Sequence, residues 1–417
     1  MAFWVWLLFK KTVNPCKKSL APGRFANKLS PPARTFQPRT SPGGSVRVLV
    51  TTDTFSGVWT YTRELVSGLV TQGAQVVLVS FGEIPLPHQT SWMQGLHGLE
   101  YHPTAFRLDW MQEGEQDFHA AQDYLCSIIH DTRPTLLHLN QLSFGSLPVD
   151  TPRLVIAHGD ILTWWLSVHG REPAASAWLD WYRESIVQGL ARAEAVVTTS
   201  RWMEEMLRLA YGDEFESHVV APGRNPIYFN PFVTKEESVL AIGRLWDTGK
   251  QVALLTHHSH GMPVCIVGAD HTVPPPPVPI RADVRVSTSK HDISVKGAQT
   301  ESQLRSLYSK ATIFAATSRY EPVGLASIEA AFSRCALVAN DTPVYREMWG
   351  DAALYFERND ADSLTETIAQ LRHDPEMARL YGTRAYNRAR EHFTARRMVD
   401  DYLRLYRQLR TSKVAVA

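Results

Sequence analysis

Two glutamates placed around a glycine form the pattern in this chain that most suggests chemistry. An apolar run over 311–317 is typical of a buried strand, and Leu325, Ile328 and Phe332 then recur at helical spacing. Gly324 lies where that helix would begin. The free backbone N–H groups and the dipole at a helix N-terminus favour a bound phosphate. The segment therefore predicts strand, loop and helix with a seat for an anion at the loop.

The two glutamates lie on either side of that helix start. Glu321 is in the loop, and Glu329 follows Gly324 at a distance of about 7 Å along the helix axis. This is roughly the separation between the diphosphate and the ribose diol of one nucleotide, and a carboxylate can accept two hydrogen bonds from a diol. The residues alone also allow a second interpretation, a surface helix with two solvated glutamates.

The sequence from Glu321 to Leu325, followed by Ile328-Glu329-Ala330, resembles the E-x7-E motif of the retaining family-4 (group 1) glycosyltransferases. Enzymes of that family have the α/β GT-B fold, in which two Rossmann-like β/α/β domains face each other across a cleft. The resemblance implies that Glu321, with the backbone at Gly324 and Leu325, meets the donor sugar and its phosphates. It also implies that Glu329 holds the ribose.

Two cations form a second pattern. Arg244 follows the apolar run 238–243, and Lys250 would begin the next helix. They resemble the family's Gly-Arg-Leu…Lys pattern, which implies a clamp on the donor diphosphate, although a solvated arginine and lysine are the alternative. Two cations can offset the charge of a leaving diphosphate without a metal ion, so we expect neither metal nor cofactor. Asp360-Ala-Asp362 precedes a helical run and is interpreted as a helix cap rather than a metal site.

The first half of the chain predicts a parallel sheet. A strand over 46–52, a helix over 58–72 and a strand over 75–80 make a β-α-β unit. The loop between the first strand and the helix resembles the family's Gly-Gly loop, with Ser56 in place of the first glycine. We therefore expect Gly57 near the donor phosphates, and a simple tight turn is the alternative.

Polar residues end two further apolar runs. His138 and Asn140 close one, and His158 and Asp160 follow the other. Strand ends of open α/β sheets point into the ligand crevice. His158 resembles the family's histidine on the donor-sugar side of the cleft, although a lone histidine can also be structural. His138, Asn140 and Asp160 are weaker candidates for contact with the acceptor.

The chain divides into four predicted parts. Residues 1–45 are an arm, 46–232 an acceptor-side domain, 237–390 a nucleotide-sugar domain and 391–417 a helix that returns to the first domain. The packing face of that last helix is expected to include Leu403, Tyr406 and Leu409. The prolines between Pro222 and Pro231 suit a stiff connector. Aromatic residues could stack on sugars, touch a bilayer or pack a core; they are Trp164, Trp165, Trp178, Trp181 and Tyr182.

Bulk composition limits the classes of partner. The 417 residues carry a net charge of +1, which gives no reason to expect a nucleic acid. The four cysteines lack metal-ligand spacing and suit a reducing compartment, so we expect a cytoplasmic protein. No apolar run approaches the roughly 20 residues that a membrane-spanning helix needs.

The arm over 1–45 has its own composition. It contains no acidic residue and is rich in Pro, Ser and Arg, which is typical of disorder. Within it, residues 2–18 combine aromatic and basic side chains and could contact the inner face of a membrane peripherally. A targeting segment and an extension without function are the alternatives.

Together these patterns predict a retaining glycosyltransferase with the GT-B fold. Its donor would be a nucleotide-diphosphate sugar, and its acceptor a hydroxyl group of a glycan, a glycolipid or a small molecule. His158 and Glu321 would contact the transferred sugar. Two alternatives are another nucleotide-sugar enzyme on the same fold, such as a hydrolysing epimerase, and a protein that binds nucleotide sugars without catalysis.

Overall fold

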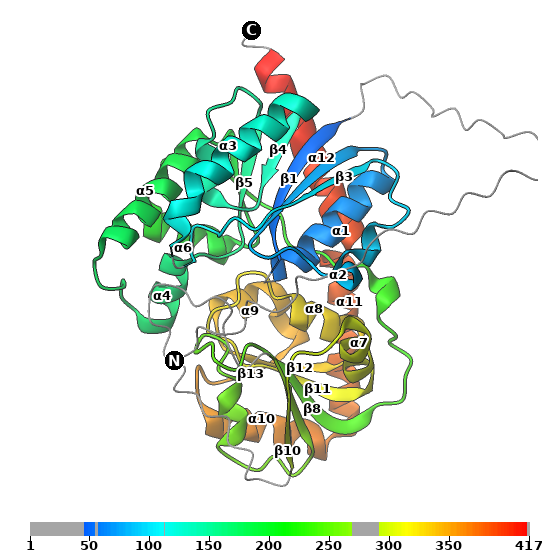
Figure 1. Cartoon of the computed structure of the whole chain (residues 1–417). Helices are drawn as coiled ribbons and strands as arrows, with labels where there is room; N and C mark the ends of the chain where they lie inside the picture. The colour runs from blue at the N-terminus through cyan, green and yellow to red at the C-terminus, as the bar shows by residue number, and fades with distance from the viewer. Residues whose placement is uncertain (1–45, 55–56, 112, 269–291, 415–417) are drawn as a thin grey trace, which may run out of the picture. The chain divides into compact units, whose positions relative to one another are not determined.

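The structure, a computed structural model, describes residues 46–54, 57–111, 113–268 and 292–414. Residues Ser45–Ala417 form one compact unit that contains two β-sheets with helices around them (Figure 1). The arm over 1–45 and Ser56 lie outside the described residues, so the predictions made for them stay predictions.

The first sheet has seven parallel strands in the order β3-β2-β1-β4-β5-β6-β7. The strands are β1 Arg47–Asp53, β2 Gln75–Phe81, β3 Leu99–Pro103, β4 Leu136–Leu139, β5 Arg153–Ala157, β6 Ala195–Thr198 and β7 Ser217–Val219. The helices of this domain are α1 Gly57–Thr71, α2 Pro87–Thr90, α3 Gly114–Thr132, α4 Ile161–His169, α5 Ala177–Arg192 and α6 Arg201–Tyr211, with 3-10 turns at Ser91–Met93, Leu142–Ser146 and Pro226–Tyr228. The predicted β-α-β start of the domain is confirmed.

Alternate residues of β1 bury against different helices, as the pleat of a strand requires. Val48 and Val50 pack with α1 and with the last helix of the chain, α12 Ala395–Val414. Leu49 packs on the opposite face with α3 and α5. Because helices cover both faces, the strands can be continuously apolar, which explains why short apolar runs were sufficient to predict them.

The second sheet has six parallel strands in the order β10-β9-β8-β11-β12-β13. The strands are β8 Glu236–Ile242, β9 Val264–Val267, β10 Ile293–Lys296, β11 Ala311–Ala316, β12 Ala336–Asn340 and β13 Leu354–Phe356. The helices are α7 Glu301–Lys310, α8 Leu325–Phe332, α9 Pro343–Trp349, α10 Ala361–His373 and α11 Pro375–His392, with 3-10 turns at Val252–Thr256 and Gly350–Ala352. Leu240 faces α8 and α11, whereas its neighbour Val239 faces α10.

Two details of this domain differ from the sequence prediction. Lys250 precedes a 3-10 turn rather than an α-helix. The last helix, predicted over 391–417, begins at Ala395, because α11 continues to His392 and the chain turns at Phe393–Thr394. At this turn Phe393 is buried and Thr394 pairs with the backbone of Arg224, so a tertiary contact ends a helix that local sequence would continue. Asp360 caps α10 through a 2.7 Å hydrogen bond from the Ser363 amide, as predicted.

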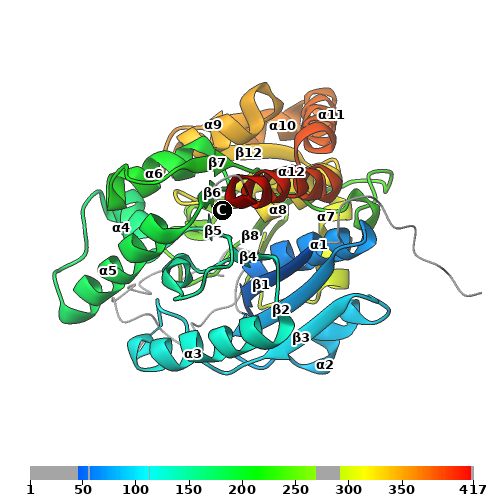
Figure 2. The ribbon, with the colours of Figure 1, turned by 90° about the horizontal axis from the view of Figure 1, so that it is seen from above.

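Helix α12 crosses back to the first domain and lies beside α1 (Figures 1 and 2). Tyr406 is fully buried there, with Leu403 and Leu409 at the margin, which confirms the predicted packing face. Tyr402 is also buried, and its hydroxyl accepts a 2.6 Å hydrogen bond from the Tyr61 hydroxyl. The helix is therefore part of the core of the first domain.

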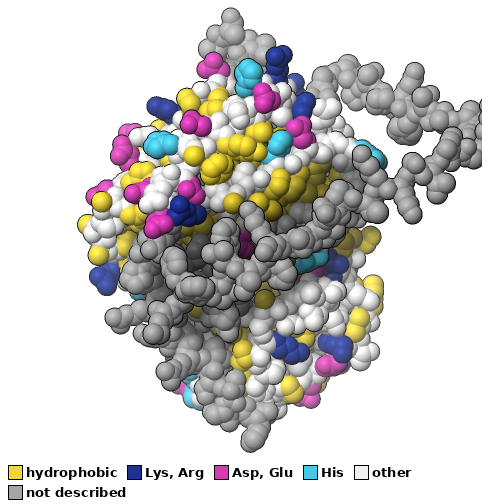
Figure 3. Space-filling model, viewed as in Figure 1, with side chains coloured by type: hydrophobic (Ala, Val, Ile, Leu, Met, Phe, Trp, Pro, Cys, Tyr) yellow, Lys and Arg dark blue, Asp and Glu magenta, His cyan; other side chains and the backbone are white. Residues whose placement is uncertain are grey.

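The surface has mixed character. Lysine and arginine side chains are interspersed with aspartate and glutamate over the described part of the face in Figure 3. Within the part of the chain that the structure describes, no helix is both long and apolar enough to cross a bilayer. Trp164, Trp165 and Tyr182 are buried, so core packing accounts for these members of the aromatic set.

Candidate functional site

The predicted site residues gather at the carboxyl ends of the strands. Gly57 follows β1, His158 follows β5, Arg244 follows β8 and Glu321 follows β11. Strands β1 and β4, and strands β8 and β11, are the neighbours at which the strand order of each sheet reverses. Ligands of doubly wound sheets bind at this position. The two sheets thus each contribute one half of the candidate site.

Lys250 and Glu321 form an ion pair at the start of α8. The Lys250 Nζ lies 2.7 Å from the Glu321 Oε2, and both side chains are largely buried. The Ser318 hydroxyl donates to the same oxygen at 2.9 Å, and the Gly324 amide donates to Oε1 at 3.3 Å. Glu321 is therefore held in one orientation at a helix N-terminus, next to a cation.

Arg244, the second predicted cation, is held by Asp247. Its Nε lies 3.1 Å from the Asp247 Oδ2, and the Gly249 amide donates to Oδ1 at 2.8 Å. Burial opposes the charge of Asp247, but Arg244 and Lys250 together hold the pKa of this carboxyl below its usual value. The Arg244 side chain keeps 45% of its surface exposed, so it remains accessible to an anion.

Several contacts join the two halves. A Cβ placed on Gly57 would lie 3.6 Å from Leu325 Cδ1, so the start of α1 lies against the start of α8. The Tyr320 hydroxyl lies 2.8 Å from the Thr163 Oγ1 and accepts from the Asp160 amide at 3.2 Å. A Cβ on Gly159, whose φ is +105°, would lie 2.5 Å from that hydroxyl, so only glycine fits beside Tyr320.

His158 is partly buried and lies between Tyr61 and Asn140. Its Nε2 is 2.8 Å from the Asn140 Oδ1, and its ring meets the Tyr61 ring edge-on at 4.5 Å between centroids. Asn140 in turn donates to the Thr51 carbonyl at 2.6 Å. Burial lowers the pKa of His158 to about 3, so the ring is neutral at physiological pH. Asn140 is thus placed to orient His158 rather than to reach outward.

The other two acceptor-side candidates have structural environments. His138 has no exposed surface, and its Nδ1 lies 2.7 Å from the Tyr406 hydroxyl on α12. Asp160 caps α4, accepting from the amides of Leu162 and Thr163, and it also accepts from the Tyr211 hydroxyl at 2.7 Å. The His138 side chain is therefore enclosed by the fold and does not reach an acceptor, whereas Asp160 is partly buried and contact of its carboxylate with the acceptor stays a prediction.

Glu329, the predicted ribose ligand, lies within α8 and has an arginine partner. Its Oε1 is 2.8 Å from the Arg224 Nε, and its side chain is 12% exposed. The Tyr308 hydroxyl also hydrogen-bonds Glu329. The carboxylate is therefore fixed before any ligand arrives.

Sequence reasoning missed three residues that shape the site: Asp247, Tyr320 and Arg224. Tyr320 directly precedes Glu321, and Asp247 lies between the two predicted cations, so position gave a weak signal for both. Arg224 is far from its partners in sequence, and only the fold brings them together.

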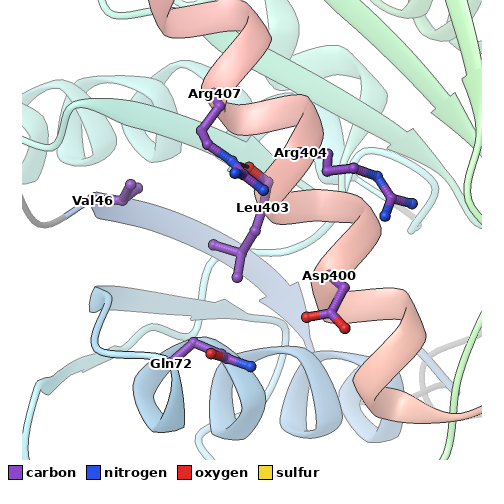
Figure 4. Close-up of a pocket in the computed structure, with 6 residues that line it drawn as sticks. All are labelled: Val46, Gln72, Asp400, Leu403, Arg404 and Arg407. Atoms are coloured by element: carbon purple, nitrogen blue, oxygen red, sulfur yellow. Dashed lines mark hydrogen bonds between the residues drawn. The ribbon is translucent and has the colours of Figure 1, made fainter. Parts of the chain in front are cut away.

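Among the described residues, no group of three or more His, Cys, Asp or Glu side chains is arranged to hold a metal ion. A cavity of about 490 Å³ lies elsewhere, between α12 and the start of β1. Figure 4 shows the residues that line it, Val46, Gln72, Asp400, Leu403, Arg404 and Arg407. None of them belongs to the candidate site.

Two family models match the chain. The model "Glycosyltransferase Family 4" matches residues 55–227, and the model "Glycosyl transferases group 1" matches residues 287–388. The first match spans most of the first domain, and the second runs from before α7 into α11 and contains both glutamates of the motif.

Curated relatives share shorter stretches. The chain is 30% identical over 115 residues to the alpha-maltose-1-phosphate synthase of Mycolicibacterium smegmatis (strain ATCC 700084 / mc(2)155), covering 26% of this chain. It is 33% identical over 104 residues to the lipopolysaccharide core biosynthesis mannosyltransferase LpcC of Rhizobium leguminosarum bv. viciae, covering 24% of this chain. Each match spans 30% of the relative's length.

Solved structures match over most of the chain. The sucrose-phosphate synthase (tll1590) from Thermosynechococcus elongatus has a TM-score of 0.69 at 19% identity, covering 88% of this chain and 100% of the neighbour. Anabaena Alr3699/HepE in complex with UDP and glucose has a TM-score of 0.65 at 13% identity, covering 87% and 100%. At these identities the matches establish the two-domain fold.

Proposed function

Because the chain belongs to the group 1, family 4 glycosyltransferases of the GT-B fold, we propose that it transfers a sugar from a nucleoside diphosphate to a hydroxyl acceptor. The observation that carries this proposal is the Lys250–Glu321 pair at the start of α8, with Gly57 against Leu325 and Gly159, the neighbour of His158, against Tyr320. One half supplies charge for a diphosphate, and the other supplies polar groups for the sugar and its acceptor.

In this proposal the second domain binds the donor. Arg244, Lys250 and the amides at Gly324 and Leu325 bind the diphosphate, where the helix dipole adds to the two cations. Glu329 accepts hydrogen bonds from the ribose hydroxyls. Gly57 allows the first domain to approach the same phosphates closely, because it has no side chain.

The reaction proceeds with retention at the anomeric carbon. The bond from that carbon to the diphosphate oxygen breaks, and the acceptor oxygen bonds to the same face of the sugar. The acceptor proton passes to an oxygen of the leaving diphosphate, so no protein nucleophile takes part. Arg244, Lys250 and the start of α8 stabilise the charge that develops on the leaving group, without a metal ion.

Glu321 and His158 orient the transferred sugar from opposite sides. The Glu321 carboxylate is fixed by Lys250 and the Gly324 amide, which leaves it to accept from sugar hydroxyls. His158 is neutral, so each ring nitrogen can either donate or accept without adding a charge. Asn140 holds the ring through its Oδ1 and thereby assigns the proton to the His158 Nε2.

The experiment that tests the donor site is a thermal-shift panel of UDP, GDP, ADP, CDP and TDP on the wild type and on Glu329→Ala. UDP has priority because the HepE structure contains it. A ligand at 100 times its Kd stabilises the folded state by about 2.7 kcal/mol. We expect one nucleotide to stabilise the wild type, and Glu329→Ala to weaken its binding by about 1–3 kcal/mol. A panel without any shift would contradict the proposal.

Activity assays test sugar transfer, the retained configuration and the independence from metal ions. Incubation with the matching nucleotide sugar and a hydroxyl acceptor should give a glycoside of retained configuration, and activity should survive EDTA. A free or epimerised sugar as the main product would instead support the hydrolysing alternative. Complete loss in EDTA with recovery in manganese would overturn the metal-free proposal.

A further inference from the structure

Arg224 is a buried cation between two glutamates from different domains. It follows β7 in the connector, and its side chain is 3% exposed. Its Nη1 lies 2.5 Å from the Glu64 Oε1 on α1, and its Nε lies 2.8 Å from the Glu329 Oε1 on α8. One guanidinium therefore joins the predicted ribose ligand to the helix that begins at Gly57.

The charges around Arg224 alternate in sign. Glu64 is also 4.0 Å from Arg63, and Arg63 pairs with Glu301 on α7. Burial opposes the charge of Arg224, but Glu329 and Glu64 raise the pKa of its guanidinium above the usual value. Such a buried pair is costly to break on one side, because the remaining charge is left without a partner.

The backbone of Arg224 is held as firmly as its side chain. Its amide donates to the Phe393 carbonyl and its carbonyl accepts from the Ala395 amide, both at 2.9 Å. A Cβ on Gly223 would lie 2.4 Å from the Thr394 carbonyl oxygen, so the connector lies directly against the turn between α11 and α12. The backbone from which the Arg224 side chain extends is therefore fixed in position.

We infer that Arg224 is a positioning residue for nucleotide recognition, which rests on the function proposed above. An ionised carboxylate offers about four lone-pair sites. The Tyr308 hydroxyl takes up one of those on Glu329, and Arg224 pairs with the same carboxylate as an ion, which leaves at least the two that a vicinal diol requires. Arg224 holds the Glu329 carboxylate turned toward the ribose, and Glu64 holds Arg224 from the acceptor-side domain.

If the ion pairs of Arg224 were purely structural, breaking them would lower the stability of the fold but would not change the preference for a ribose over a dideoxyribose. The two roles are therefore separated by comparing each ribonucleoside diphosphate with its 2′,3′-dideoxy counterpart, which lacks both hydroxyls. Wild type, Glu329→Ala, Arg224→Met, Arg224→Lys and Glu64→Gln would be titrated with both forms of the nucleotide that stabilises the wild type. The measured quantity is the ratio of the two Kd values.

We expect the wild type to prefer the ribose form by about tenfold or more, the effect of losing polar contacts to a charged partner. Arg224→Met should abolish most of this preference by weakening the ribose form alone. Arg224→Lys, which keeps the charge but cannot contact both glutamates in the same geometry, should give an intermediate ratio. Glu64→Gln should also reduce the ratio. It provides the test if Arg224→Met does not fold.

Arg153→Met is the matched control. Arg153 is buried like Arg224, but its guanidinium donates to the carbonyls of Gly145, Leu147 and Val149 in the first domain. The Arg153→Met variant should be less stable than the wild type but should keep the wild-type ratio of the two Kd values. The ratio could stay at the wild-type value in Arg224→Lys and Glu64→Gln while Glu329→Ala loses it. This result would overturn the positioning role of Arg224 and leave the ribose-binding role of Glu329 standing. A wild type that binds no nucleotide would overturn the proposed function.

Discussion

Lys250 has two tasks in the proposed chemistry, because its ammonium pairs with Glu321 and faces the leaving diphosphate. Replacing it with methionine keeps much of the length of the side chain but removes the charge. We expect Lys250→Met to lower kcat by about 10²–10³, the usual effect of losing one group that stabilises developing charge. Steady-state kinetics with saturating donor and acceptor measure this.

The control for that experiment is Lys310→Met. Lys310 pairs with Glu236 at 3.0 Å on the surface of the same domain, with both side chains about half exposed. Such pairs contribute little to stability. Activity should stay near the wild-type value, and an equal loss in both variants would show that the effect of Lys250 is not specific to the site.

His138 provides a test by pH. Burial lowers its pKa to about 3, with the nearby His158 as a second cause. Between that value and the ordinary 6.5, the unfolded chain binds a proton that the folded chain does not, so stability falls as pH falls. We expect His138→Gln to reduce the loss of unfolding free energy between pH 6.5 and 5, by at most about 1.4 kcal/mol per pH unit.

Urea denaturation at several pH values measures this difference. His130→Gln is the control, since His130 is exposed on α3 and its side chain is 83% accessible. It should follow the wild-type dependence on pH. If His138→Gln and the wild type have the same slope, the imidazole of His138 is not excluded from protonation in the folded state.

At the scale of elements, sequence patterns predicted the strands and helices that depend on the local spacing of apolar residues. The apolar runs that became β1 and β11 were recognisable because parallel strands are buried on both faces. Helix α8 was recognisable from the spacing of Leu325, Ile328 and Phe332. The last helix was predicted to start at residue 391 and starts at Ala395, where the pairing of Thr394 with Arg224 fixes the turn before it.

The same division holds for the site. Glu321 and Lys250 were predicted from motifs within single loops, and the structure pairs them. His138 was predicted as a weak candidate for acceptor contact, but it is fully buried beneath α12, which comes from the other end of the chain and which a strand end does not reveal. Arg224 had no local signal at all, because its role depends on contacts with two helices far away in sequence.

Gly324 decides how α8 begins. It has a φ of +69°, and a Cβ there would lie 2.4 Å from the Met348 Cε. We expect Gly324→Ala to lose more than the roughly 1–2 kcal/mol that a left-handed conformation costs an ordinary residue, since the side chain must also displace Met348. Donor affinity should fall with it, because the amides of this turn are proposed to bind phosphate. Urea denaturation and nucleotide titration measure the two effects.

Gly73→Ala separates the backbone effect from the site. Gly73 has a φ of +86° and nothing within 4 Å of a Cβ, and it lies after α1, on the far end from Gly57. It should lose stability through the backbone alone and bind nucleotide as the wild type does. Equal losses of donor affinity in both variants would show that the start of α8 has no special part in binding.

At the scale of the molecule, contacts at many points connect the two domains. The Trp164 indole donates to Asp247 at 3.2 Å, and the amides of Arg201 and Trp202 donate to the Glu347 carboxylate. Glu347 thereby caps α6 from the other domain, which a helix N-terminus favours. These contacts hold together the two sides from which the site is built.

Helix α12 adds a covalent and a packing connection, which leads to a prediction about cooperativity. It leaves the second domain after α11 and buries Met398, Val399 and Tyr402 in the first. We therefore expect one unfolding transition, with far-UV circular dichroism and tryptophan fluorescence giving the same midpoint in urea.

Tyr402→Ala removes a fully buried ring and its hydrogen bond to Tyr61, and should lower the free energy of unfolding by about 3–5 kcal/mol. Leu380→Ala on exposed α11 surface should cost less than about 0.5 kcal/mol. Separate midpoints for the two signals in the wild type, or a wild-type midpoint in Tyr402→Ala, would mean that α12 does not stabilise the first domain as the packing indicates.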